Sequence, residues 1–185
     1  QDMKLHIQNK FTSELPADAA QTNEPRQVHN ACYSFVEPKK PLNPSLIHAS
    51  KEIAKEIGLS EEDLGSTDFL NVFSGNKIYP ETKPYAMAYA GHQFGNWAGQ
   101  LGDGRAINLT EVEHENKTYT LQLKGAGPTP YSRTADGFAV LRSSIREYLC
   151  AEAMYYLGVP TTRSLSLILS GDQVVRDVLY NGNRA

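Results

Sequence analysis

The chain has few cysteines, no long hydrophobic run and no cluster of basic residues, and each absence excludes a class of protein. Its two cysteines, Cys32 and Cys150, lack metal-ligand spacing and fit a reducing compartment. No apolar stretch approaches the roughly 20 residues of a membrane-spanning helix. The formal charge of −3 is spread without a basic run, which argues against a nucleic-acid surface. We therefore expect a cytoplasmic protein that binds neither a membrane nor nucleic acid.

The composition is that of an ordinary globular protein. Hydrophobic residues make up 40% and charged residues 21% of 185 positions, which predicts a packed core in one domain, or in a lobe with an extended arm. The chain starts at Gln1 rather than at Met, and its last residues, 181–185, contain no closing element. These ends predict a fragment of a longer protein.

The first part of the chain predicts an arm followed by helices. Residues 1–43 are rich in Pro, Asn, Gln and Lys, with one short strand expected within 31–36. Asn43-Pro44-Ser45 has the pattern of a helix start, and Gly58 that of its end. Ser60 predicts the start of a second helix that carries Leu64, Phe69 and Leu70.

The character of the sequence changes at Pro84, so we divide the chain into an arm with helices (1–83) and a lobe (84–185). The glycines of 91–99 predict a tight loop. Residues 106–112 and 119–124 alternate as two strands of a hairpin with a four- or five-residue turn.

A long helix is expected next, from Phe138 to Gly158, with its main apolar stripe on one face. Residues 162–169 and 174–180 predict a second hairpin after it. A helix laid across an antiparallel sheet is an α+β design, and this order is typical of a protein-kinase-like N-terminal lobe.

The candidate chemistry centres on a lysine and a glutamate. Lys124 ends a predicted strand and is followed by the Gly/Pro loop 125–130, which leaves space for a phosphate beside the ammonium group. Glu147 lies among small and apolar residues of the long helix, so we expect it to be partly buried and paired with Lys124. The alternatives are a local pair with Arg146 or Arg142, simple exposure of Glu147, or a Lys124 that only faces water.

Two glycine-containing turns are weaker signals. Gly102-Asp-Gly104-Arg105 precedes a strand, and Arg105 adds a fork-shaped set of donors suited to phosphate, although short glycine patterns also occur in ordinary turns. Asp136-Gly137 precedes the long helix, where an Asp N-cap explains both residues without any ligand.

Several long motifs resemble the selenoprotein O family of pseudokinase-like proteins, most closely from Pro84 to Tyr180. The matching segments are Tyr89-Ala-Gly-His-Gln-Phe-Gly95, Gly102-Asp-Gly-Arg105, Gln122-Leu-Lys-Gly-Ala-Gly-Pro-Thr-Pro-Tyr-Ser-Arg133, Asp136-Gly137 and Leu141-Arg-Ser-Ser-Ile-Arg-Glu-Tyr-Leu149.

The resemblance implies a kinase-like fold that binds ATP in a flipped orientation and transfers AMP to Ser, Thr or Tyr hydroxyls of protein substrates. It implies that Glu147 holds Lys124, and that the nucleotide contacts Gly102, Gly104, Arg105, Lys124, Asp136 and Gly137. The catalytic base and the ligands of Mg²⁺ or Mn²⁺ are expected beyond Ala185, so this chain contains no catalytic residue and no metal site of its own.

Three hypotheses follow for the full-length protein. The first is a protein adenylyltransferase, the second an ordinary ATP-dependent phosphotransferase, and the third a non-catalytic nucleotide-binding module that regulates a partner. For the fragment alone we expect no transfer activity and feeble ATP binding. We also expect self-association through the apolar patch where the second lobe would dock.

Overall fold

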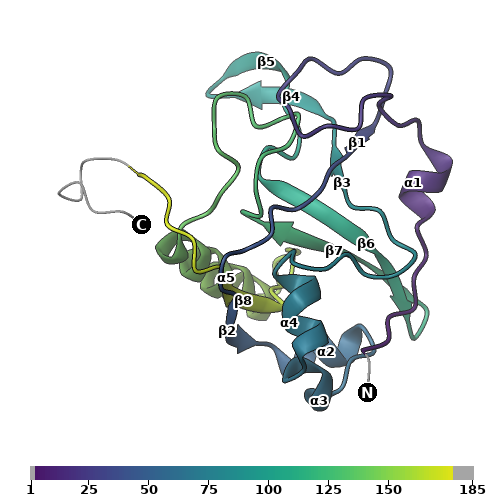
Figure 1. Cartoon of the computed structure of the whole chain (residues 1–185), viewed down its shortest axis with the longest axis vertical. Coiled ribbons are helices and arrows are strands. Elements are labelled where there is room, and N and C mark those ends of the chain that lie inside the picture. Colours follow the sequence, from purple (N-terminus) through teal and green to yellow (C-terminus); the bar gives the residue numbers. More distant parts are fainter. Residues whose placement is uncertain (1–2, 177–185) are drawn as a thin grey trace.

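The computed structural model describes residues 3–176 and contains helices and antiparallel strands (Figure 1). In chain order the elements are α1 (Lys10–Glu14), β1 (Tyr33–Phe35), β2 (Ser45–Ala49), α2 (Lys51–Glu56), α3 (Glu61–Leu64), α4 (Thr67–Phe73), β3 (Tyr85–Met87), β4 (Ala90–Gln93), β5 (Asn96–Gln100), β6 (Ala106–His114), β7 (Lys117–Lys124), α5 (Leu141–Tyr156) and β8 (Ser166–Leu169).

The strands form three sheets. The largest has the order β1-β3-β6-β7 with antiparallel neighbours, and the pairs β2-β8 and β4-β5 form two small sheets. The fold is therefore α+β, as the sequence predicts. The short strand expected within 31–36 is β1, and it brings the N-terminal segment into the same sheet as the central hairpin.

Strand β7 of the hairpin follows the predicted alternation, whereas the first five residues of β6 are all buried. Leu121 and Leu123 are buried, whereas the intervening polar side chains and Lys124 are exposed. The turn is tighter than the four or five residues predicted, because pairing continues to His114↔Lys117. Only Glu115 and Asn116 lie between the strands, with φ values of 48° and 62° that fit a type I′ turn.

The helix predicted from Asn43 is wrong in its first half. Residues Ser45–Ala49 form β2, which pairs with β8, a strand more than a hundred residues later in the sequence. The helix α2 begins only after Ser50, whose side chain accepts a hydrogen bond from the Ile53 amide.

The helix predicted at Ser60 exists but is shorter than expected. Ser60 and Asp63 form a reciprocal capping box at the start of α3. The helix ends at Gly65, and Ser66 caps a separate helix, α4, which carries Phe69. The single helix predicted from Ser60 is therefore two helices, α3 and α4.

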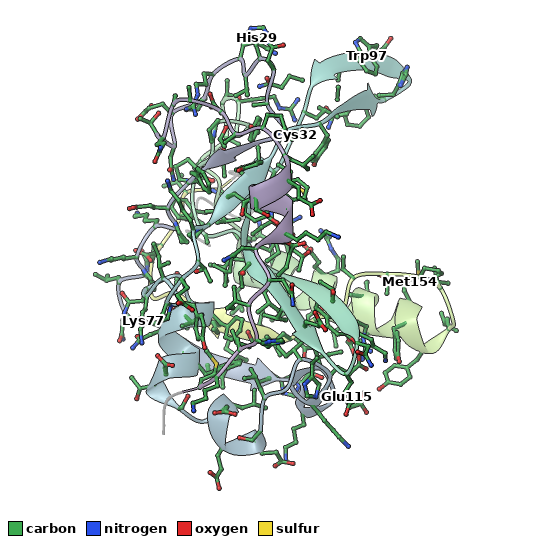
Figure 2. All side chains as sticks on the ribbon, turned by 90° about the vertical axis from the view of Figure 1, so that its right-hand side faces the viewer. His29, Cys32, Lys77, Trp97, Glu115 and Met154 are labelled. Atoms are coloured by element: carbon green, nitrogen blue, oxygen red, sulfur yellow. The ribbon has the colours of Figure 1, made fainter. Side chains whose placement is uncertain are left out.

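The loop predicted over 91–99 is instead a hairpin. Strands β4 and β5 pair from Ala90↔Gln100 to Gln93↔Asn96, with Phe94 and Gly95 in the turn at φ values of 51° and 79°. The hairpin lies at the opposite end of the molecule from α2 and α3 (Figure 1). Its labelled Trp97 projects away from the main sheet (Figure 2).

The long helix is α5, which begins at Leu141 rather than Phe138 and ends at Tyr156. None of its residues is buried, so the predicted apolar stripe is not core. The strand β8 follows it, but pairs with β2 rather than with the predicted segment 174–180. Residues 174–176 are not in a strand, and 177–180 lie outside the described residues.

Two core clusters stabilise this arrangement. The larger lies between α2–α4 and the inner face of β6–β7, and includes Phe69, Val112 and Leu121. The smaller contains Ile107 from β6 and Tyr131 from the loop between β7 and α5. Tyr131 thereby fixes that loop to the sheet.

Candidate functional site

An open cleft of about 860 Å³ lies beside the β6–β7 hairpin, at the end opposite its turn, where β6 begins and β7 ends. Its walls come from the β4–β5 hairpin, from the turn before β6, from the end of β7 and from the loop before α5. All of the predicted nucleotide-binding residues line this cleft: Gly102, Gly104, Arg105, Lys124, Asp136 and Gly137. Its volume is within the usual range for ligand sites, about 300–1,000 Å³.

The glycine turn is packed tightly against the Tyr131 loop. Gly102 has a φ of 120°, and a Cβ there would lie 2.5 Å from Cγ of Tyr131. At Gly104, a Cβ would lie 2.9 Å from the Tyr131 carbonyl oxygen. Both positions therefore require glycine for packing, whether or not a phosphate approaches the turn.

Asp103, between these glycines, anchors the turn. Its buried carboxylate accepts hydrogen bonds from the Met87 amide at 2.8 Å and from Asn108 Nδ2 at 2.9 Å. Its own carbonyl oxygen accepts from Thr129 Oγ1 at 2.6 Å. Burial raises the pKa of Asp103, while the hydrogen bonds from Met87 and Asn108 and the charge of Lys124 oppose the rise. Sequence reasoning assigned this residue no role.

Lys124 and Glu147 approach each other, but not in a buried pair. Lys124 Nζ lies 3.8 Å from Glu147 Oε1, with the side chains 42% and 53% exposed. The expectation that Glu147 is partly buried is wrong, because more than half of its side chain is exposed to solvent. An ion pair this exposed contributes about 0–1 kcal/mol to stability.

Asp136 does not cap α5. The helix follows Val140, which makes no side-chain cap, and Asp136 instead accepts from the Phe138 amide at 3.0 Å. Arg176 binds the same carboxylate with two nitrogens, at 2.6 Å and 3.1 Å. Burial alone would raise the pKa of Asp136, but the bonds from Arg176 and Phe138 outweigh it and lower the pKa.

Gly137 holds two loops together. Its φ is 76°, and a Cβ there would lie 2.2 Å from the Gly127 carbonyl oxygen. The Gly127 amide in turn donates to the Gly137 carbonyl at 3.2 Å. The position needs glycine because the Gly/Pro loop after Lys124 passes directly against it.

The charge of the cleft favours an anion. Four Lys or Arg residues line it (Arg105, Lys124, Arg133 and Arg176) against two acidic residues, Asp103 and Asp136. Arg176 neutralises Asp136, and Asp103 is buried beneath the turn. Sequence reasoning missed Arg133, Arg176 and the β4–β5 wall, because no local pattern shows which loops meet across the sheet.

Two kinds of feature are not found within residues 3–176. No helix there is long and apolar enough to cross a membrane. No group of three or more His, Cys, Asp or Glu side chains in that range is arranged to hold a metal ion.

Comparison with known proteins places these features in a family. The model of the family described as protein adenylyltransferase SelO matches residues 18–181. Proteins named protein nucleotidyltransferase YdiU are similar to this chain in Flavobacterium johnsoniae (76% identical) and Rhodopirellula baltica (58%), over 98% and 97% of the chain. The chain spans only 35% and 33% of those relatives, about a third of their length. It belongs to the SelO family of protein adenylyltransferases.

Proposed function

We propose that the full-length protein transfers AMP from ATP to Ser, Thr or Tyr hydroxyls of protein substrates, and that this chain contributes the nucleotide-binding lobe. The observation that carries the proposal is the single cleft that unites Arg105 and Lys124 with the Gly102–Gly104 turn. The family and the relatives that match the chain are named for nucleotidyl transfer, which supports the same reaction class.

In this reaction the acceptor oxygen attacks the α-phosphorus of ATP and the bond to the β-phosphate breaks. Pyrophosphate leaves with the electron pair of that bond, and the hydroxyl proton passes to a base outside this chain. Arg105 and Lys124 bind the β and γ phosphates, so their charge stabilises the leaving pyrophosphate. This requires ATP to lie flipped relative to its orientation in ordinary kinases, with the α-phosphorus facing the acceptor.

The fold that goes with this function is a kinase-like N-terminal lobe. By this proposal the chain divides into an arm with helices (1–83) and the lobe (84–185), with β1 and β2 of the arm pairing with β3 and β8 of the lobe. A divalent cation, Mg²⁺ or Mn²⁺, would be held by residues outside this chain and would neutralise phosphate charge when bound. Cys32 and Cys150 are both free thiols, which is compatible with a reaction in the cytoplasm.

Labelling at two positions of ATP tests the reaction. The full-length protein is incubated with Mg²⁺ and ATP radiolabelled at either the α- or the γ-phosphate, with its own chain and an unstructured Ser/Thr/Tyr-rich protein as acceptors. We expect the α label on protein and the γ label in released pyrophosphate. Label from the γ position on protein would identify a phosphotransferase instead. Saturable ATP binding with neither label transferred would identify a regulatory module.

A further inference from the structure

We propose that Arg133 is a further polyphosphate-binding residue of this cleft and that Gln93 positions its guanidinium. The inference rests on the proposed nucleotide site, and it adds a cation that neither the sequence motifs nor the family match assigned to it. Arg133 lines the cleft from the loop before α5, and Gln93 lines it from the β4–β5 hairpin.

The backbone at Arg133 is held in an uncommon conformation. Its φ is 57°, in the left-handed region where residues other than glycine are uncommon. Such a conformation costs free energy and persists only where the surroundings fix it. Here they do, because the preceding residues, Thr129, Tyr131 and Ser132, are all buried.

Hydrogen bonds within that loop fix the point at which Arg133 leaves it. The Ser132 hydroxyl accepts from the Thr129 amide at 2.8 Å and donates to the Gly104 carbonyl of the glycine turn. The Ser132 amide donates to the Thr129 carbonyl at 3.1 Å, and the Ala135 amide donates to the Ser132 carbonyl at 2.9 Å. The strained residue is thus tied to the turn that carries Arg105.

The guanidinium of Arg133 has no carboxylate partner within the described part of the chain. Its hydrogen bond is to a neutral amide, from Nη1 to Gln93 Oε1 at 3.2 Å. This contrasts with Arg176 and Lys124, which face Asp136 and Glu147. An exposed arginine on an ordinary surface needs no partner, but this one borders a cleft that also contains Arg105 and Lys124.

Arg105, Lys124 and Arg133 together have the charge and the N–H donors that suit a polyphosphate. The fork of N–H donors on an arginine matches phosphate oxygens, and one bond to Gln93 leaves most of these donors available. The same bond joins the loop to the hairpin that projects at this end of the molecule (Figure 2). Gln93 therefore limits the directions that the guanidinium adopts before a ligand arrives.

The test compares four variants of the full-length protein: Arg133→Gly, Arg133→Lys, Gln93→Ala and Lys117→Ala. Calorimetry with Mg-ATP and with adenosine gives affinities, and thermal melting gives stability. Glycine tolerates the observed φ, so Arg133→Gly should melt no lower than the wild type. It should bind ATP at least about tenfold more weakly, with adenosine affinity unchanged, since the contact is to phosphate.

The other variants test separately how the charge of Arg133, the orientation of its guanidinium and its place in the cleft contribute to ATP binding. Arg133→Lys should recover part of the ATP affinity because it keeps the charge without the fork. Gln93→Ala should weaken ATP binding less than Arg133→Gly does. Lys117→Ala removes a positive charge at the far end of the β6–β7 hairpin, beside the labelled Glu115, and should bind ATP like the wild type (Figure 2).

The outcomes distinguish this inference from the proposed function. Wild-type ATP affinity in a folded Arg133→Gly variant would overturn the inference and leave AMP transfer intact. A low melting temperature with loss of adenosine binding would also overturn it, because the residue would then be structural. If Arg133→Gly weakens ATP binding while the wild type transfers no α label, the inference stands and the proposed function fails.

Discussion

At the scale of single residues, the glycines of the cleft are explained by packing as well as by phosphate. Gly102 and Gly99 both have positive φ, at 120° and 70°, but an added Cβ would meet another atom within 4 Å only at Gly102. We expect Gly102→Ala to destabilise the protein by about 2–4 kcal/mol, through strain and the clash with Tyr131. Gly99→Ala, the matched control, should cost about 1 kcal/mol.

Chemical denaturation of the two variants measures this difference. Equal losses of stability in Gly102→Ala and Gly99→Ala would show that the contact with Tyr131 is relieved at little cost. The turn would then be more adaptable than its packing indicates.

Substitution of the cleft cations should affect activity rather than stability. Lys124 and Arg105 are exposed, and surface substitutions usually change stability by less than about 0.5 kcal/mol. We expect Lys124→Ala and Arg105→Ala in the full-length protein to lose most ATP-dependent transfer while their melting temperatures stay near that of the wild type. Parallel losses of transfer and stability would instead make both residues structural.

At the scale of elements, the sequence predicts best where local and long-range signals agree. The β6–β7 hairpin alternates in polarity and is closed by its own turn, and the Ser60–Asp63 capping box needs only four neighbouring residues. The β2 strand has no such support. Its Asn43-Pro44 start resembles a helix, and the pairing with β8 that makes it a strand cannot be seen locally.

Local sequence patterns likewise predict only part of the candidate site. The motifs identified six residues that line the cleft, because each lies in a turn or at a strand end with a recognisable composition. They did not show that Arg176 reaches Asp136, or that Asp103 accepts a hydrogen bond from the Met87 amide of β3, because each contact joins segments that are separate in the sequence. The β4–β5 hairpin was missed because its turn, Phe94-Gly95, lacks the Asn-Gly or Asp-Gly signal of two-residue hairpins.

The arm beside the cleft offers a prediction of pH dependence. Asp18 accepts from two Arg26 nitrogens and from the Ser34 hydroxyl, which in turn bonds to Tyr131. Burial acts to raise the pKa of Asp18, but the bonds from Arg26 and Ser34 outweigh it and place the pKa below the ordinary 3.8. The ionised carboxylate therefore stabilises the fold above about pH 3.8, and this contribution is lost as the pH falls through the folded-state pKa.

We expect Asp18→Asn to cost about 1.5–3 kcal/mol at neutral pH. The difference from the wild type should shrink as the pH falls below 3.8. Unfolding free energies measured across pH test this. Glu14→Gln on the same arm is the control, because the Glu14 pair with Lys10 is 3.9 Å long and exposed, so little change is expected at any pH. A pH-independent loss in Asp18→Asn would show that the charge of Asp18 does not matter.

At the scale of the whole molecule, α5 presents a large apolar face to solvent. Leu149 of α5 and Leu157, the residue after its last turn, are 63% and 78% exposed, and the helix extends away from the sheet at its labelled Met154 (Figure 2). Contiguous apolar patches of more than a few hundred Å² mark interaction sites. By our proposal the rest of the full-length protein covers this face, so the chain on its own should self-associate through it.

Sedimentation velocity tests that expectation. The chain should form dimers or larger species, and Leu149→Ser with Leu157→Ser should shift it toward monomer. Leu15→Ser, on the arm near α1, is the control and should leave association unchanged. A monomeric chain at high concentration would show that the face of α5 is tolerated in water.

The last prediction concerns what the chain does with ATP on its own. Lys124 and Arg105 face the open cleft, and no metal-binding cluster occurs within residues 3–176. Without protein ligands to hold the metal ion of Mg-ATP in the cleft, each phosphate contact acts in nearly aqueous dielectric, where two charges about 4 Å apart attract by only about 1 kcal/mol. We therefore expect Mg-ATP to bind more weakly than about 0.1 mM in calorimetry, a free energy of about −5.5 kcal/mol or less in magnitude. Low-micromolar binding would mean that Arg105, Lys124 and Arg133 make a complete nucleotide site by themselves, and would favour the regulatory module over the transferase.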